Sequence, residues 1–149
     1  MKTNAVLVDR VFAVTDELVD VMARLLPQLS TSAVAPDRAA LQEIVDSPTS
    51  SLFVARVSPG DAIVGSITVL IYRIPTGVHA VIEDVVVDES ARGHGVGAAL
   101  VFEAIELAKR RGARHVNLTS RASREEANRL YQRAGFVIRD TNVYRLNLS

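Results

Sequence analysis

An α/β fold built on one mixed sheet is predicted by three observations. Runs of β-branched and apolar residues separated by turn residues over 51–87 predict an antiparallel meander. A succession of strand, helix, strand, helix and strand over 78–148 predicts a sheet covered by helices. A short glycine-dense loop at 92–97 joins one of these strands to its helix. The 149 residues predict a single domain, 1–149, with enough chain to bury a core.

The N-terminal third predicts one short strand and two helices. An apolar run at 5–8 is the first strand. Thr15 stands in an N-cap position before an apolar stripe at helical spacing that ends near Pro27. Pro36 is placed to begin a second helix, which stops before Pro48. We expect these helices to cover a sheet, and they could also wall a substrate pocket.

The middle of the chain predicts the meander. Strands at 51–57 and 62–74 are joined by the turn 58–61, and a third strand follows at 78–87. Gly65 inside the second strand indicates a β-bulge.

The C-terminal part predicts two helices and the strands that follow them. The helix that starts at Val96 ends at Arg111, with Gly112 as its C-cap, and a strand follows at 115–119. Ser123 caps a helix that runs to Arg133, and a last strand, or two, is predicted at 136–148.

Composition excludes several functional classes. Lys plus Arg and Asp plus Glu both total 17, so charge does not favour nucleic acid or an anionic membrane as a partner. There is no cysteine, which excludes a disulfide scaffold and a thiolate metal site, and the three histidines lack metal-ligand spacing. The N-terminus has no signal-peptide core, and the longest uncharged apolar run, 62–72, is shorter than the roughly 20 residues that span a bilayer. We expect a soluble cytoplasmic protein without a metal.

The stretch 81–97 has the chemistry of an anion site. It reads as a strand, a glycine loop and the start of a helix. The N–H groups of a helix's first turn have no intrahelical partner and lie at the positive end of the helix dipole. Glycine at 93, 95 and 97 removes the Cβ atoms that would keep a phosphate from those amides. The sequence therefore predicts a pyrophosphate cradle.

Other glycine loops fit less well. Residues 93–98 satisfy the G-x-G-x-x-G/A dinucleotide pattern, but the next strand ends Leu118-Thr119-Ser120 without the acid that would hold a ribose. The loop also lacks the Gly-Lys-Ser/Thr of a nucleoside triphosphate loop. A purely structural glycine turn stays an alternative.

Two motifs carry a resemblance to a known family. Residues 92–97, Arg-Gly-His-Gly-Val-Gly, resemble the acyl-CoA loop of the GNAT superfamily of N-acyltransferases, and Ala127-Asn128-Arg129-Leu130-Tyr131 followed by Gly135-Phe136 resembles its second signature. The resemblance implies a GNAT-like fold, in which an antiparallel N-terminal meander leads into splayed central strands flanked by helices. It also implies that the pantetheine arm of acetyl-CoA lies in the gap that opens beside the strand 81–87.

The same resemblance assigns the binding of acetyl-CoA, the acyl donor. The residues concerned lie on the strand end, the loop and the later helix: Val85, Val86, Val87, Arg92, Gly93, His94, Gly95, Val96, Gly97, Ala98, Asn128 and Tyr131. Because the loop acts through backbone amides, we expect the side chains of His94 and Val96 to be replaceable.

Acyl transfer to nitrogen needs a neutral amine, so a base must accept a proton, and the departing thiolate benefits from a proton donor. Tyr131 matches the family tyrosine that serves as general acid. Glu83 is the favoured base, because it resembles the acid of the Ile-Glu-Asp motif of glucosamine-6-phosphate N-acetyltransferases; Asp84 and a water chain are alternatives, and His79 is an outside candidate. Strand alternation predicts that Glu83 and Asp84 point to opposite faces of the sheet.

The acceptor site is the least defined. Ribosomal-protein N-terminal acetyltransferases carry a base where this chain has Thr119, and Tyr144 and Arg145 on the polar tail either contact substrate or lie on an exposed edge. The resemblance implies direct transfer of an acetyl group from acetyl-CoA to a primary amine of a small molecule or peptide. A non-catalytic acyl-CoA-binding module is the alternative, and a homodimer is left open.

Overall fold

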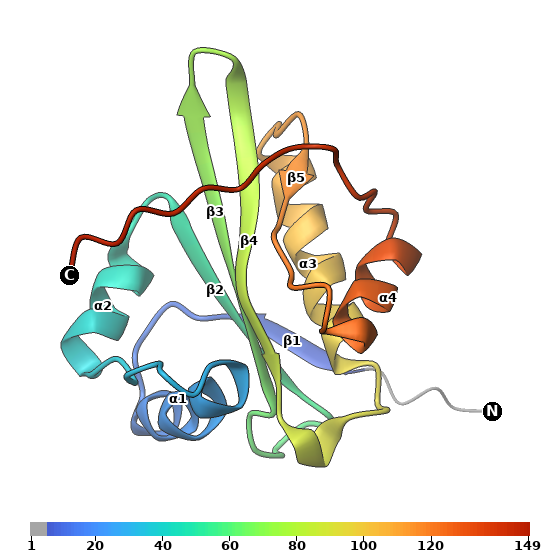
Figure 1. Cartoon of the computed structure of the whole chain (residues 1–149). Coiled ribbons are helices and arrows are strands. Elements are labelled where there is room, and N and C mark those ends of the chain that lie inside the picture. Colours follow the sequence, from blue (N-terminus) through green and yellow to red (C-terminus); the bar gives the residue numbers. More distant parts are fainter. Residues whose placement is uncertain (1–5) are drawn as a thin grey trace. The chain divides into compact units, whose positions relative to one another are not determined.

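The computed structural model describes residues 6–149, and these divide into two units that meet at Thr119 and Ser120 (Figure 1). Each unit is described by itself. Residues 1–5, which include Ala5 at the start of the predicted first strand, lie outside the described part of the chain.

The first unit holds one five-stranded sheet with the strands in chain order. The strands are β1 (Leu7–Arg10), β2 (Ser50–Arg56), β3 (Gly65–Ile74), β4 (Gly77–Val87) and β5 (Val116–Asn117). Neighbours from β1 to β4 are antiparallel, and β5 lies parallel to β4. The predicted mixed sheet with an N-terminal meander is confirmed.

Helices lie on both faces of this sheet. Figure 1 shows α1 (Asp16–Leu29) and α2 (Arg38–Asp46) on one face and α3 (Val96–Arg110) on the other. Thr15 caps α1 as predicted, since its Oγ1 accepts a hydrogen bond from Leu18 N–H at 3.1 Å. The cap of α2 is Asp37, whose carboxylate accepts from Ala40 N–H at 2.8 Å, so Pro36 lies just before the cap.

The core beneath α1 and α2 explains their apolar stripes. Leu18, Val21, Met22 and Leu25 of α1 pack with side chains of α2 and with the facing side of β2 and β4. Each is at least 95% buried, and burying such a side chain contributes roughly 1.5–3 kcal/mol. Among the helices of residues 6–149, none is long and apolar enough to cross a membrane.

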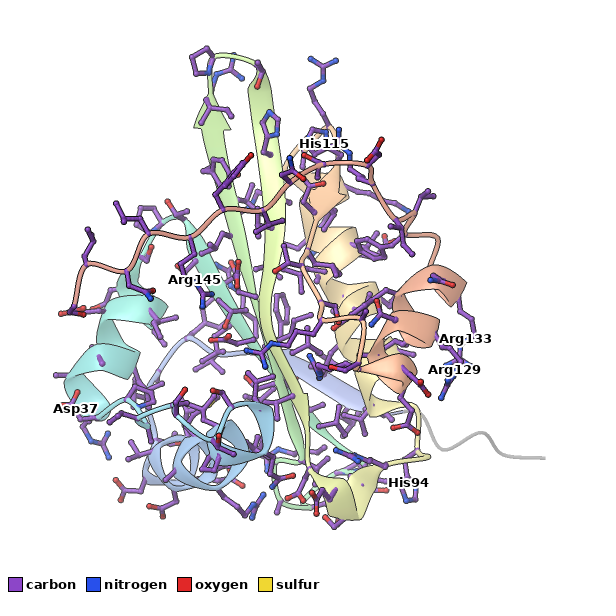
Figure 2. The ribbon with its side chains drawn as sticks, in the orientation of Figure 1. Asp37, His94, His115, Arg129, Arg133 and Arg145 are labelled. Carbon is purple, nitrogen blue, oxygen red and sulfur yellow. The ribbon has the colours of Figure 1, made fainter. Side chains whose placement is uncertain are left out.

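The second unit contains α4 (Glu125–Arg133) followed by an irregular tail. The cap position is Arg124 rather than the predicted Ser123, and the helix is followed by Gly135 with a left-handed φ of 103°. In Figure 2, Arg129 and Arg133 project from the same side of α4, as residues four apart on a helix do.

The predicted last strand at 136–148 is wrong. No strand forms there in the described structure, and Val137, Ile138 and Val143 are at least 75% exposed. The polar run 139–142 interrupts the alternation that would bury one face of a strand, so the tail has no continuous apolar face to pack against a core.

Candidate active site

A β-bulge interrupts β4 where the sequence places its two acids. Ser66 of β3 is paired with Val86, but Thr68 is paired with Glu83, so two residues of β4 oppose the single residue Ile67. The extra residue is Asp84, whose φ of 50° is the one left-handed value at a non-glycine position in the described residues. Aspartate tolerates this conformation better than most residues, and bulges of this kind re-aim side chains beside functional sites.

The bulge overturns the prediction that Glu83 and Asp84 point to opposite faces. Glu83 is directly opposite Thr68, so the two side chains share a face, and Asp84 lines the same pocket as Thr68. One inserted residue breaks the period-two alternation between them. Both acids therefore serve the face covered by α1 and α2, and both are solvent-exposed rather than buried under a helix.

The environment of Glu83 suits a base. Partial burial raises the pKa of Glu83 above the ordinary glutamate value, and the negative charge of Asp84 raises it further. A carboxylate whose pKa is raised holds a proton more strongly. It is therefore a better acceptor for a proton leaving an amine.

A pocket of about 60 Å³, here called the bulge pocket, lies beside these acids. Its walls include Met22 and Leu26 of α1 and Leu41 and Ile44 of α2. Thr68 and Asp84 contribute polar groups from the sheet. The prediction that the first two helices could wall a pocket did not single out these residues, because an apolar stripe on a helix has the same sequence pattern whether it fills a core or lines a cavity.

The sheet opens on the other edge of β4. Only Ala80 and Val81 pair with β5, through Val116 and Asn117, so β4 has no partner in β5 from residue 82 to residue 87. The side chains of Val85 and Val86 are buried in the core, which leaves the backbone of this stretch for contact with a ligand. An unpaired strand edge can accept an extended ligand through main-chain hydrogen bonds.

The loop that follows β4 has the geometry of a cradle. Gly93 and Gly95 have φ values of 85° and 77°, and a Cβ built on either would meet no atom within 4 Å. The N–H groups of residues 93–95 donate no hydrogen bond to another described residue. Gly95 is the N-cap of α3, so free amides and the positive end of the helix dipole lie together. These features fit a pyrophosphate group.

The loop is anchored to α1 through a turn, the 3-10 helix η1 (Glu89–Ala91). Arg24 Nε lies 3.1 Å from a carboxylate oxygen of Asp88, and Glu89 N–H donates to the side chain of Gln28 at 3.0 Å. Asp88 also accepts from Ser90 N–H, and these contacts hold the pKa of Asp88 below its usual range. The sequence does not reveal the roles of Arg24 and Gln28, because a polar residue on a helix carries no signal for the turn that it contacts.

In the second unit, Tyr131 lies on α4 and is 6% exposed. Its ring meets Phe136 edge-on with centroids 6.1 Å apart, and burial raises the pKa of Tyr131. The phenol is therefore protonated at neutral pH, as a proton donor must be. The amide of Asn128 donates to the carbonyls of Arg121 and Arg124 at 2.8 Å each, which fixes the turn before α4.

The remaining candidates lie elsewhere. His79 bonds to Thr76 and to His115 at 2.8 Å each, near the hairpin end of β4 and away from the bulge. His115 is labelled there in Figure 2, whereas His94 projects from the loop before α3. Thr119, Tyr144 and Arg145 are exposed residues outside the strands. No group of three or more metal-ligating side chains occurs among residues 6–149.

The sequence pattern of the acetyltransferase (GNAT) family matches residues 18–136, which is most of the chain. The protein therefore belongs to this family, as the resemblance predicted. The uncharacterized N-acetyltransferase MJ1207 of Methanocaldococcus jannaschii is 44% identical over 57 residues, which cover 38% of this chain and 25% of the archaeal protein. The match thus spans a quarter of that relative's length.

Solved structures agree with the fold. A protein described as a transcriptional regulator from Bacillus halodurans C-125 is 28% identical, with a TM-score of 0.80 over 96% of this chain and 100% of that one. The aminoglycoside acetyltransferase meta-AAC0020 from an uncultured soil metagenomic sample, solved with sisomicin, has the same TM-score at 19% identity over 97% and 96% of the two chains. At that identity the likeness concerns the fold alone.

Proposed function

We propose that this protein is an acetyl-CoA-dependent N-acetyltransferase that transfers the acetyl group directly to a primary amine. One observation carries the proposal: a single strand, β4, presents two acids at a bulge, leaves its edge unpaired and leads into the glycine cradle. The base candidates and the donor site are therefore held at a fixed spacing by one element.

The loop and its neighbours each have a role in binding acetyl-CoA, the acyl donor. The amides of residues 93–97 bind the pyrophosphate of CoA, with Arg92 beside them as a cation. The backbone of Val85, Val86 and Val87 lines the pantetheine arm, and Asn128 lies on α4 as a further contact. Acetyl-CoA supplies a thioester, whose carbonyl carbon accepts the amine nitrogen.

The chemistry then needs two proton transfers. As the carbon–nitrogen bond forms, Glu83 takes the proton that leaves the nitrogen, directly or through a water. As the carbon–sulfur bond breaks, Tyr131 gives its phenolic proton to the thiolate. Direct transfer proceeds without a covalent enzyme intermediate, and the chain has no cysteine that could carry the acetyl group as a thioester.

The second candidate is a non-catalytic acyl-CoA-binding module. It is favoured by the full-length likeness to a protein described as a transcriptional regulator. Such a module retains the cradle but has no use for a base with a raised pKa.

A release assay separates the two functions. The protein is incubated with acetyl-CoA and a panel of amines, amino sugars, polyamines and peptides, and free CoA is measured, while calorimetry measures acetyl-CoA binding. An amine-dependent release of CoA that falls in Glu83→Gln supports the transferase. Saturable acetyl-CoA binding with no release for any acceptor supports the binding module.

A further inference from the structure

The bulge pocket has a composition that selects among amines. Most of its lining is apolar, and its polar residues all come from the sheet. The apolar lining is Met22, Leu26, Pro36, Leu41, Ile44, Leu52 and Val86, and the polar lining is Ser66, Thr68 and Asp84. A hydroxyl buried against the helix side, which has only apolar residues, loses its hydrogen bonds to water without gaining others. Each methylene group that is buried there should instead raise the equilibrium or specificity constant about fourfold, which corresponds to about 0.8 kcal/mol of transfer free energy.

The size of the pocket limits the length of the group. Its volume is about 60 Å³, whereas a cavity of about 150 Å³ lined by similar residues takes up benzene. A sugar ring with its hydroxyls is therefore both too polar and too large. A short unbranched alkyl chain fits.

The polar end of the pocket complements an ammonium. Asp84 is held there by the bulge, with Thr68 on the same lining, and Glu83 is the residue before Asp84 on β4. A primary amine arrives mostly protonated, because its pKa is about 10. One acid can thus hold the ammonium while its neighbour accepts the proton.

We infer that the acceptor of this enzyme is a short aliphatic primary amine, whose alkyl chain fills the bulge pocket and whose ammonium group binds Asp84. This inference rests on the proposed N-acetyltransferase function. The ammonium first loses one proton to Glu83, which releases it to solvent. The neutral nitrogen then attacks, and Glu83 takes the second proton as the carbon–nitrogen bond forms and passes it to solvent in turn. Tyr131 recovers its proton from solvent, so the products are an N-alkyl acetamide, free CoA and one released proton.

A substrate ladder tests the inference with acetyl-CoA as donor. Ethylamine, propylamine, butylamine, hexylamine, ethanolamine and glucosamine are compared by kcat/KM. We expect about a fourfold rise for each methylene until the pocket is full, then a plateau or fall, with ethanolamine and glucosamine below propylamine. Equal values along the ladder, or a preference for glucosamine, would overturn the inference and leave the transferase function standing. No CoA release with any amine, while acetyl-CoA still binds, would overturn both.

Two variants of α2 localise the effect. Ile44 lines the pocket, and its neighbour Val45 has similar partial burial but does not line it. Ile44→Phe should move the optimum to a shorter amine, whereas Val45→Phe should leave the optimum where it is. The melting temperature of each variant shows that it folds. An unchanged optimum in folded Ile44→Phe would show that the alkyl chain lies elsewhere.

Discussion

Gly65 of β3 and Val96 of α3 touch so closely that no side chain fits between them. A Cβ built on Gly65 would stand 2.8 Å from Val96 Cγ1 and 3.1 Å from a methyl of Leu100. Both neighbours belong to the start of α3, which is the helix that carries the free amides of the cradle. The glycine thus sets the distance at which the helix N-terminus rests on the sheet.

Gly65→Ala should therefore destabilise the protein. The added methyl must displace the first turn of α3, and overpacking of this kind costs about 1–3 kcal/mol. Urea denaturation measures the loss, and calorimetry should show weaker acetyl-CoA binding as the helix moves. Gly60→Asn is the matched control, because Gly60 has a left-handed φ that Asn tolerates and open space around it. Equal stability of Gly65→Ala and the wild type would mean that α3 is free to shift.

The close contact of Gly65 with Val96 also shows why the glycine was only partly interpretable from the sequence. Gly65 predicted a bulge, and the irregularity does come next to it, but on β4 at Asp84 rather than at the glycine itself. A glycine in a strand signals either a bulge or a close neighbour, and here the neighbour is a helix more than 30 residues further on.

The prediction at Thr15 shows where a local pattern is sufficient, although the cap predicted at Ser123 lies one residue later, at Arg124. The cap at Thr15 was predicted correctly because its hydrogen bond spans three residues. The face of Glu83 depended on an inserted residue whose effect exists only in the pairing of β3 with β4. The tail at 136–148 contained apolar residues but no partner strand for them among those described, and pairing cannot be read from one strand alone.

Gly95 should be far less replaceable than His94. Gly95→Asn keeps the left-handed backbone but puts a side chain over the amides, so we expect acetyl-CoA affinity to fall at least tenfold, about 1.4 kcal/mol. His94 is exposed and contributes its backbone, so His94→Ala should change affinity by less than about twofold. Calorimetry on both variants decides the matter. Similar affinities would contradict a backbone cradle.

The pKa of Glu83 should govern the low-pH side of the rate profile. Asp84 raises that pKa through its charge, so Asp84→Asn should lower it, and the acidic limb of kcat/KM should move to lower pH. The plateau should also fall, because the ammonium loses its partner. Asp20→Asn, at an exposed position of α1, is the control and should leave the limb in place. If the acidic limb of kcat/KM stays at the same pH in Asp84→Asn, a group other than Glu83 titrates there.

Glu17 and Arg56 should give a pH-dependent contribution to stability. Arg56 donates two hydrogen bonds to Glu17, at 2.8 and 2.7 Å, and these lower the pKa of Glu17. Because the folded pKa lies below the unfolded one, the contribution is present above the unfolded pKa and is lost as pH falls through the folded pKa.

Glu17→Gln should accordingly reduce the free energy of unfolding by about 0.5–1 kcal/mol at pH 7, since the pair is partly exposed and screened. The difference from wild type should shrink as the pH is lowered through the folded pKa of Glu17. Glu43→Gln on the exposed side of α2 is the control. A difference that stays constant with pH would show that the lost interaction does not depend on the charge of Glu17.

Tyr131→Phe separates a proton donor from a packing residue. The substitution keeps the ring that meets Phe136, so the fold and acetyl-CoA affinity should change little. It removes a phenol whose pKa is raised by burial and which therefore keeps its proton at neutral pH. If that proton goes to the departing thiolate, kcat should fall about 100-fold or more while the Kd for acetyl-CoA stays within about twofold.

Tyr72→Phe is the control for this prediction. Tyr72 lies on β3 beside His79, so the substitution removes a phenol remote from the bulge and should leave kcat unchanged. A wild-type kcat in Tyr131→Phe would show that Tyr131 only packs against Phe136. The thiolate would then take its proton from solvent.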